Sequence, residues 1–295
     1  MTLSDIFEEL RPRQWTKNLI VLAPFLFALG DKQQHLSFSM AGLALAAALL
    51  FAITSSGVYV WNDISDLEYD RAHPHKKNRP IAMGRISIGA AWLLATLCLA
   101  AGLSGAWLIN PRFGVVTAAY IALQAAYTLF LKHLPLVDIF VIAFGFVLRA
   151  VAGAVAIGVF FSPWLFICTF LMALFLGLCK RRQEKHLMAV AQKEALRPSL
   201  KSVNERLFDQ LIAITAGAVI VAYAVYTQWP ETVAKFKTSH LSLTIPFVIF
   251  GIFRYLYLVY HHEKGEQPES VLLTDVPLLA DIVLFGLSVA AIIVF

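Results

Sequence analysis

Nine apolar runs, most of them about 20 residues long, follow one another along almost the whole chain. They cover residues 19–30, 38–61, 87–109, 113–131, 135–160, 163–179, 210–229, 243–260 and 276–295. About 20 apolar residues are what an α-helix needs to cross a bilayer. Only 15% of the residues are charged, against about 25% in soluble proteins. We therefore expect an all-α, polytopic membrane protein, with nine transmembrane helices forming a single domain over residues 1–295.

The first run, 19–30, allows two interpretations. Three basic residues precede it and small residues close it, a pattern that is also typical of a signal peptide. Pro24 in the middle of the run and Trp15 at its expected interface favour a retained first helix that begins near Pro12.

The basic residues are distributed unevenly between the two sides of the membrane. With the amino terminus in the cytoplasm, the nine spans place 19 of the 24 lysines and arginines on the cytoplasmic side and four on the other. This bias is the one that the positive-inside rule predicts. The two long charged connections, 62–86 and 180–207, both fall on the cytoplasmic side. We therefore expect a cytoplasmic active-site cavity that binds phosphates and lipid head groups, and no nucleic acid.

A polar motif follows the second apolar run. It contains one asparagine and three aspartates, Asn62, Asp63, Asp66 and Asp70. On an α-helix, at about 100° per residue, these four side chains fall within one arc of about 100°, whereas Glu68 faces away. Three carboxylates on one face repel each other unless cations lie among them, and their hard oxygens suit Mg²⁺, which in turn binds diphosphates. We predict that the three aspartates are catalytic and bind Mg²⁺, and that Asn62 orients them.

Polar residues near the cytoplasmic ends of the other runs are further candidates for substrate binding. They are Lys17, Asn18, Arg71, Lys76, Arg79, Tyr127, Lys132, Asp138, Lys180, Arg181, Glu184, Arg254 and Tyr255. For several of the basic residues, the alternative is an anchoring role at the membrane surface.

Arg149 lies inside the fifth apolar run, about 16 Å deeper than Asp138 if both are on one helix. A charge at this depth is costly and normally faces a partner or a watery cavity. One interpretation is a buried ion pair, for which Asp281 in the last run is the candidate partner. The other is that Arg149 gives the cavity floor a positive charge for an anionic substrate.

The aspartate motif and the basic residues behind it resemble the UbiA-type intramembrane prenyltransferase superfamily, over nearly the whole chain. The details are similar to its decaprenyl-phosphate phosphoribosyltransferase branch. They are Arg11-Pro12-x-Gln14-Trp15-x-Lys17-Asn18, Lys180-Arg181-x-x-Glu184, Arg254-Tyr255, Pro268-Glu269 and Asp275. This resemblance implies a Mg²⁺-dependent enzyme of the bacterial inner membrane. It would transfer 5-phosphoribose from phosphoribosyl diphosphate to a polyprenyl phosphate, release pyrophosphate and serve the synthesis of cell-wall arabinan precursors.

One departure from the superfamily separates the alternatives. Aromatic prenyltransferases carry a second aspartate-rich motif where this chain has Lys180, Arg181 and Glu184. A donor with an additional phosphate and an acceptor that is itself a phosphate need more fixed positive charge, which favours the phosphoribosyl interpretation. Transfer of a polyprenyl group to an aromatic acid such as 4-hydroxybenzoate and non-catalytic transport of a phosphorylated lipid or sugar are the alternatives. A homo-oligomer and a lid formed by residues 266–275 are compatible with the sequence.

Overall fold

The structure is a computed structural model that describes residues 2–30, 38–73, 76–190, 203–261, 271 and 274–294. Every regular element in these ranges is a helix, as the apolar runs predict. The chain divides into two compact units. The first comprises Met1–Phe25 and Ser37–Phe161, and the second comprises Leu26–Leu36 and Ser162–Phe295.

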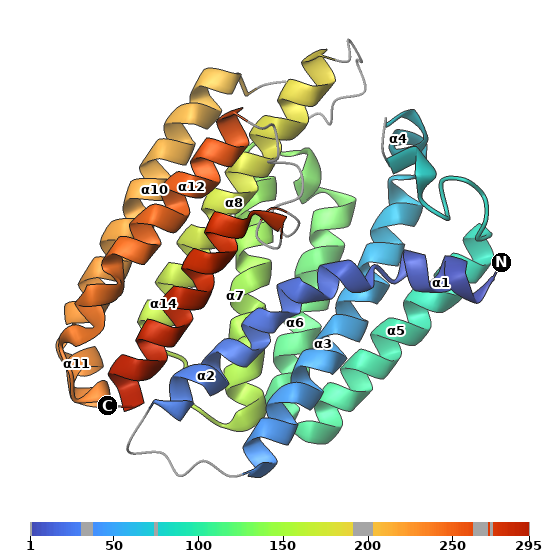
Figure 1. Cartoon of the computed structure of the whole chain (residues 1–295). Coiled ribbons are helices and arrows are strands. Elements are labelled where there is room, and N and C mark those ends of the chain that lie inside the picture. Colours follow the sequence, from blue (N-terminus) through green and yellow to red (C-terminus); the bar gives the residue numbers. More distant parts are fainter. Residues whose placement is uncertain are drawn as a thin grey trace. The chain divides into compact units, whose positions relative to one another are not determined.

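Four long helices form the body of the first unit, where α3 packs against α5 and α6 lies between α5 and α7 (Figure 1). A 3₁₀ segment, η1, precedes them and contacts both α3 and α7. The elements are α1 (Leu3–Glu9), η1 (Pro12–Leu22), α3 (Phe38–Ser65), α4 (Leu67–Ala72), η2 (Lys76–Asn78), α5 (Ile88–Ile109), α6 (Pro111–Leu129), η3 (Leu131–His133) and α7 (Val137–Ile157). Helix α2 (Ala23–Leu29) crosses from the first unit into the second.

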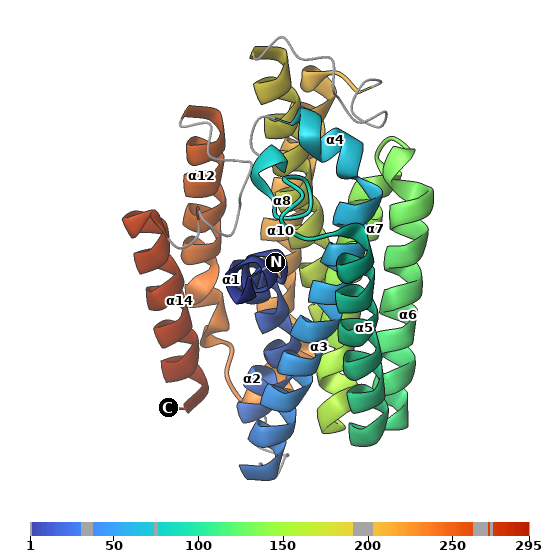
Figure 2. The same ribbon diagram turned by 90° about the vertical axis from the view of Figure 1, so that its right-hand side faces the viewer.

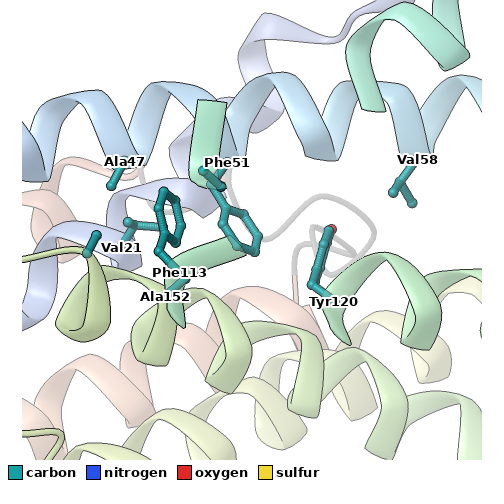
Figure 3. Close-up of a cluster of buried hydrophobic side chains, with 9 residues drawn as sticks. Val21, Ala47, Phe51, Val58, Phe113, Tyr120 and Ala152 are labelled. Atoms are coloured by element: carbon teal, nitrogen blue, oxygen red, sulfur yellow. The ribbon is translucent and has the colours of Figure 1, made fainter. Parts of the chain in front are cut away.

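The core of the first unit combines aromatic rings with small residues (Figure 3). The rings of Phe51 and Tyr120 lie 4.7 Å apart between centroids. Gly153 of α7 contacts the backbone of η1, and a Cβ atom there would lie 1.9 Å from the carbonyl oxygen of Val21. Only glycine allows the two backbones to approach so closely, as is common where membrane helices pack.

The second unit contains α8 (Pro163–Val190), α10 (Glu205–Gln228), α11 (Pro230–Phe236), η4 (His240–Thr244), α12 (Ile245–His261) and α14 (Val276–Val294). Helix α8 packs against α10, and α12 packs against α14 (Figure 2). The last of these helices is largely apolar, and most of its side chains are exposed or half-buried within the unit, as expected for a surface that faces lipid.

Seven helices of the described part are long and apolar enough to cross a membrane. They are Ser39–Ser65, Ile88–Ile109, Val137–Ile157, Pro163–Leu187, Glu205–Gln228, His240–His261 and Val276–Ile293. The two remaining runs, 19–30 and 113–131, fall in η1 with α2 and in α6, which are helical but are not among these seven. The prediction of an all-helical polytopic protein is confirmed, whereas nine spans and a single domain stay predictions.

Candidate active site

The aspartate motif lies where α3 ends and the chain continues as α4. Asp66 is a turn residue between the two helices, with φ −96° and ψ 10°. The backbone N–H groups of Asp66 and Asp70 nevertheless each donate to the carbonyl oxygen four residues earlier, both at 2.8 Å. The motif is therefore interrupted at Asp66 and not one continuous helix, but it keeps the periodicity of a helix.

This periodicity places the three aspartates on one side of the chain. Asp63, Asp66 and Asp70 are only 2%, 3% and 2% exposed, whereas Glu68 is exposed. The burial of the three aspartates and the exposure of Glu68 agree with the predicted division of the motif, whereas the role of the aspartates stays a prediction.

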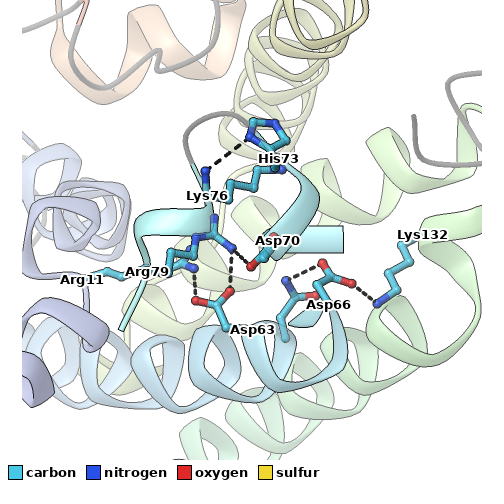
Figure 4. Close-up of polar contacts among 9 residues, drawn as sticks. Arg11, Asp63, Asp66, Asp70, His73, Lys76, Arg79 and Lys132 are labelled. Atoms are coloured by element: carbon cyan, nitrogen blue, oxygen red, sulfur yellow. Dashed lines mark hydrogen bonds and ion pairs between the residues drawn. The ribbon is translucent and has the colours of Figure 1, made fainter. Parts of the chain in front are cut away.

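Each aspartate of the motif contacts a basic side chain from elsewhere in the first unit (Figure 4). Arg79 Nη1 lies 2.9 Å from Asp63 Oδ1 and 2.5 Å from Asp70 Oδ2. Arg11 pairs with the second oxygen of Asp63. Lys132 Nζ lies 2.6 Å from Asp66 Oδ1, and both of these side chains are buried. The predictions that Arg79 and Lys132 belong to the site of the aspartates are thus supported by direct contacts.

The electrostatics of the motif favour a cation between two of its carboxylates. Burial raises the pKa of Asp70, the charge of Arg79 opposes this rise, and the neighbouring carboxylate of Asp63 adds to it. Because Arg79 Nη1 is within hydrogen-bond distance of both carboxylates, these two side chains converge on one point. The guanidinium group of Arg79 lies at this point and supplies a positive charge to both carboxylates.

The donor atoms fit a divalent cation, although the three aspartates do not converge on a single point. Within the described ranges, no three His, Cys, Asp or Glu side chains form a metal-binding group. Asp66 contacts Lys132 and accepts a hydrogen bond of 3.1 Å from Asn62 Nδ2. Asn62 Oδ1 is buried and has no hydrogen-bond partner in the part of the chain that the structure describes. Asp63 and Asp70 are the residues that would hold Mg²⁺, since their buried, charged oxygens are the ligands that this ion prefers.

A strained turn brings Arg11 to the motif. Its backbone is left-handed, with φ 55° and ψ 56°, which is unfavourable for a residue other than glycine and especially before a proline. The guanidinium lies 5.5 Å from the ring centre of Tyr59 as well as against Asp63. The residue before Arg11 is held to α3, because Ser56 Oγ donates to Leu10 O at 2.8 Å. The surrounding contacts therefore keep a conformation that the local sequence disfavours.

Arg149 is buried in the first unit among neutral groups. Its Nε donates to Asn18 Oδ1 at 2.9 Å, Nη1 to Gly145 O at 3.1 Å and Nη2 to Tyr120 OH at 2.8 Å. The guanidinium also lies 5.1 Å from the ring centre of Phe146. Neutral oxygens and aromatic rings of the first unit thus surround Arg149, and the ion pair with Asp281, which belongs to the second unit, stays a prediction. Asn18, predicted to bind substrate, serves here as an acceptor for this arginine.

The remaining predicted residues of the first unit differ in whether they lie near the aspartate motif. The charge of Lys76 acts on Asp70, so Lys76 lies near the motif. Arg71 is exposed and donates to the carbonyl oxygen of Ala82 at 3.3 Å, outside the cluster. Lys17 is half-buried and donates to Gln14 Oε1 at 3.4 Å. Tyr127 is half-buried near the end of α6 and Asp138 is buried in the first turn of α7.

The second unit contains the other predicted cluster. Arg181 Nη1 pairs with Glu184 Oε2 at 2.6 Å, with both side chains buried. Arg254 makes two hydrogen bonds to Asp275, of 3.0 and 2.9 Å. Tyr255 is buried with its ring packed edge-on against Phe175. That these residues face the aspartate motif stays a prediction, and most of the expected 266–275 loop, including Pro268 and Glu269, lies outside the described residues.

Comparison with known proteins places both units in one family. Residues 19–274 match the model of the UbiA prenyltransferase family. The chain belongs to this family. The resemblance inferred from the motifs is thereby confirmed, and with its seven apolar helices the chain is an integral membrane protein.

Several curated proteins are similar to this chain over most of their length. The chain is 34% identical to decaprenyl-phosphate phosphoribosyltransferase of Mycobacterium tuberculosis, over 92% of this chain and 89% of that protein. The enzyme of the same name from Corynebacterium glutamicum is 34% identical, over 92% of this chain and 81% of its own. A UbiA homolog from Archaeoglobus fulgidus, solved with GPP and Mg²⁺, shares the fold, with a TM-score of 0.71, 19% identity and coverage of 99% and 100% of the two chains.

Two buried polar residues of this UbiA-family chain were not predicted from the sequence. Glu9, at the end of α1, is 1% exposed, and neither of its carboxyl oxygens has a hydrogen-bond partner within the described ranges. Burial and the charge of Asp63 raise the pKa of Glu9 to about 8. Gln183 of α8 is fully buried, and its amide has no partner among the described residues. A short polar helix such as α1 is normally exposed to solvent, so its sequence gives no signal that Glu9 is buried.

Proposed function

We propose that this UbiA-family protein transfers 5-phosphoribose from phosphoribosyl diphosphate to a polyprenyl phosphate and releases pyrophosphate. The product would serve as a precursor of cell-wall arabinan. The observation that carries this proposal is the 34% identity, over 92% of the chain, to proteins named decaprenyl-phosphate phosphoribosyltransferase. The basic side chains around the aspartate motif support it, because the donor and the acceptor are both anionic.

The aspartate motif would handle the diphosphate of the donor. A solved relative holds Mg²⁺ together with GPP, and such an ion, when bound to the motif, would neutralise the charge of the departing diphosphate. Asp63 and Asp70 would hold this ion, because both of their carboxylates contact the same nitrogen of Arg79 and therefore lie close together. Lys76 and Arg79 are the candidates to hold the diphosphate oxygens, because both act on the carboxylates of the motif.

The reaction breaks the bond between the ribose carbon and the diphosphate oxygen, and pyrophosphate departs with the electron pair. An oxygen of the lipid phosphate then bonds to this carbon from the opposite face, so its configuration is inverted. A phosphate monoester is already ionised at neutral pH, and no general base is needed. The 5-phosphate and the acceptor phosphate would be bound by Lys132, Lys180 and Arg181. The ribose hydroxyls would be contacted by Glu184.

The uneven distribution of basic residues supports a location for this chemistry. We place the protein in the bacterial plasma membrane, with the amino terminus and the active-site cavity on the cytoplasmic side. The polyprenyl tail would extend between helices into the lipid. A homo-oligomer is a further proposal, to be checked by the mass of the detergent-solubilised protein.

A reconstituted reaction tests the function. Purified protein, Mg²⁺, labelled phosphoribosyl diphosphate and a polyprenyl phosphate should yield a labelled ribosyl lipid and pyrophosphate. If no such lipid forms and a prenyl diphosphate reacts with an aromatic acid instead, the proposal is wrong. Transport of a labelled substrate into vesicles without pyrophosphate release would also contradict it.

A pair of substitutions in the motif tests the role of its buried face. Asp66→Asn should lower turnover by at least about 100-fold at any Mg²⁺ concentration, because it removes the buried charge beside Lys132. Glu68→Gln is the matched control, since Glu68 belongs to the same motif but is exposed. Near-normal turnover of Asp66→Asn would remove this residue from the catalytic set.

A further inference from the structure

Gln183 is a buried amide that the proposed reaction does not yet use. It belongs to the part of α8 that carries the predicted substrate-binding residues Lys180, Arg181 and Glu184, and 0% of it is exposed. Both polar atoms of its side chain, Nε2 and Oε1, are buried and lack a hydrogen-bond partner in the described part of the chain. Burying such groups unpaired is costly. An amide both donates and accepts hydrogen bonds, so the partner that fits Gln183 must do both as well.

The contacts of Arg182 show which side of α8 carries this amide. Arg182 Nε lies 2.5 Å from Asp209 Oδ1 of α10, and its guanidinium lies 4.1 Å from the ring centre of Tyr260 in α12. At about 100° per residue, Gln183 and the three predicted residues fall within an arc of about 160°, centred opposite to Arg182. One side of α8 thus contacts α10 and Tyr260, and the other carries a polar face. This polar face consists of Lys180, Arg181, Gln183 and Glu184.

Two charged side chains of the polar face are buried as Gln183 is. Arg181 is 4% exposed and Glu184 is 7% exposed, and the two form an ion pair of 2.6 Å. Apolar residues of similar volume often stabilise a fold as well as a buried ion pair does, so stability alone does not explain three buried polar side chains on one face. Because the charges of the pair compensate each other, Gln183 adds neutral hydrogen-bonding groups beside it.

A sugar hydroxyl matches the amide of Gln183 better than a phosphate does. The oxygens of an ionised phosphate only accept hydrogen bonds, so they would pair with Nε2 and leave Oε1 unpaired. A hydroxyl group donates as well as accepts, and adjacent hydroxyls of a sugar can satisfy both atoms of one amide. The donor of the proposed reaction has such hydroxyls on its ribose, whereas a prenyl diphosphate has none.

We propose that Gln183 binds the ribose hydroxyls of the donor and thereby selects a phosphoribosyl diphosphate over a prenyl diphosphate. This inference deepens the proposed function and rests on it, because it requires a ribosyl donor. Glu184 of the same polar face would contact these hydroxyls as a carboxylate, which only accepts hydrogen bonds, and Gln183 adds the donor that Glu184 lacks. The alternative is a structural role, in which the amide fills space and pairs with ordered water.

Donor analogues that lack one hydroxyl distinguish these two roles. The kcat/KM for ribosyl-lipid formation is measured with phosphoribosyl diphosphate and with its 2-deoxy and 3-deoxy forms. The original protein is compared with Gln183→Met, which has a similar shape but no amide. The original protein should prefer the complete donor to at least one deoxy form, and Gln183→Met should reduce this preference by about tenfold. A structural role lowers kcat/KM equally for all three donors, and an unchanged preference therefore overturns the proposal.

Two further variants complete the test. Gln210→Met is the matched control, because it makes the same substitution at an exposed glutamine of α10, and its donor preference should stay within about twofold of the original. If Gln183→Met does not fold, Gln183→Asn is measured in the same way. It keeps the amide but withdraws it from the ligand, so it should also lose preference for the complete donor. An unchanged preference in the variant that folds contradicts a contact with the ribose.

Failure of this inference can be told apart from failure of the proposed function. If the original protein forms no ribosyl lipid from the complete donor, the proposed function is wrong and the role of Gln183 falls with it. If the original protein forms this lipid and Gln183→Met keeps the same preference among the donors, only the role of Gln183 is wrong.

Discussion

Asp63 and Asp70 share one guanidinium nitrogen, whereas Asp66 has an ammonium group of its own. The motif therefore consists of two parts with different partners, although its residues lie on one face. The pair that shares Arg79 is suited to a bridging cation, since its oxygens already converge on one atom. Asp66 is suited to holding Lys132, a candidate for a substrate phosphate, in a buried position.

Removing the partner of Asp66 should destabilise the first unit. Lys132→Met leaves a buried carboxylate without its ammonium group, a change that costs about 3–5 kcal/mol when one member of a buried pair is lost. The Tm in chelator should fall by several degrees. Lys132→Met combined with Asp66→Asn should recover part of this loss, and a Tm unchanged by Lys132→Met alone would contradict a paired, buried lysine.

The raised pKa of Glu9 predicts a dependence of stability on pH. Its pKa is about 8 in the folded protein, above the 4.5 that is usual for glutamate, so the folded state holds the proton more tightly than the unfolded state does. This contribution is fully present below about pH 4.5, is lost as the pH rises towards 8, and changes little beyond that. Thermal unfolding in chelator should show the Tm of the original protein falling across this window more steeply than that of Glu9→Gln. Parallel curves would show that Glu9 does not titrate there.

At the scale of elements, the amino-terminal segment matters because it carries residues into the site. Segment η1 contacts α3 and α7, and its Asn18 accepts hydrogen bonds from Arg149 of α7 and Ser55 of α3. The preceding helix α1 supplies Glu9. A segment that is neither long nor uniformly apolar thus joins two membrane helices through polar contacts.

The close approach of η1 to α7 can be tested at Gly153. Gly153→Ala places a methyl group against the carbonyl of Val21, and such overpacking costs about 1–3 kcal/mol or more. We expect a lower Tm and lower activity, because the shift of η1 also disturbs Asn18 and Arg149. Gly42→Ala is the control, since nothing lies within 4 Å of its added atom and alanine favours a helix by about 0.5–1 kcal/mol. Equal effects of the two changes would refute a specific backbone contact.

At the scale of the molecule, one family model spans both compact units, from residue 19 to residue 274. Each unit contributes one cluster of charged residues, the aspartate motif in the first and the pair of Arg181 and Glu184 in the second. The proposed reaction needs fixed positive charge for two anionic substrates, and both clusters contain it. This division of charged residues is consistent with a transferase that binds a donor and an acceptor.

The proposed membrane topology predicts which loops are accessible from outside. In a variant without Cys98, Cys168 and Cys179, single cysteines are introduced at Glu68 in α4 and at Glu231 in α11, both exposed positions. A membrane-impermeant maleimide applied to spheroplasts should label Glu231→Cys and spare Glu68→Cys, and permeabilisation should expose both. Labelling of Glu68→Cys in intact spheroplasts would contradict the proposed orientation.

Local periodicity explains what could be predicted from the sequence. The apolar runs predicted a helical membrane protein, because about 20 residues cross a bilayer whatever they pack against. The side that Asp63, Asp66 and Asp70 share, with Glu68 opposite, follows from the rotation of about 100° per residue within one segment. Neither property depends on distant parts of the chain.

The partners of these residues depended on the tertiary structure. Lys132 lies 66 residues from Asp66 in the chain, and Arg11 lies 52 residues from Asp63, so only helix packing brings them together. The same packing buries Glu9 at the end of a polar helix and surrounds Arg149 with neutral oxygens. Spacing in a sequence describes one helix at a time, whereas the charge that compensates a buried group comes from whichever helix is packed beside it.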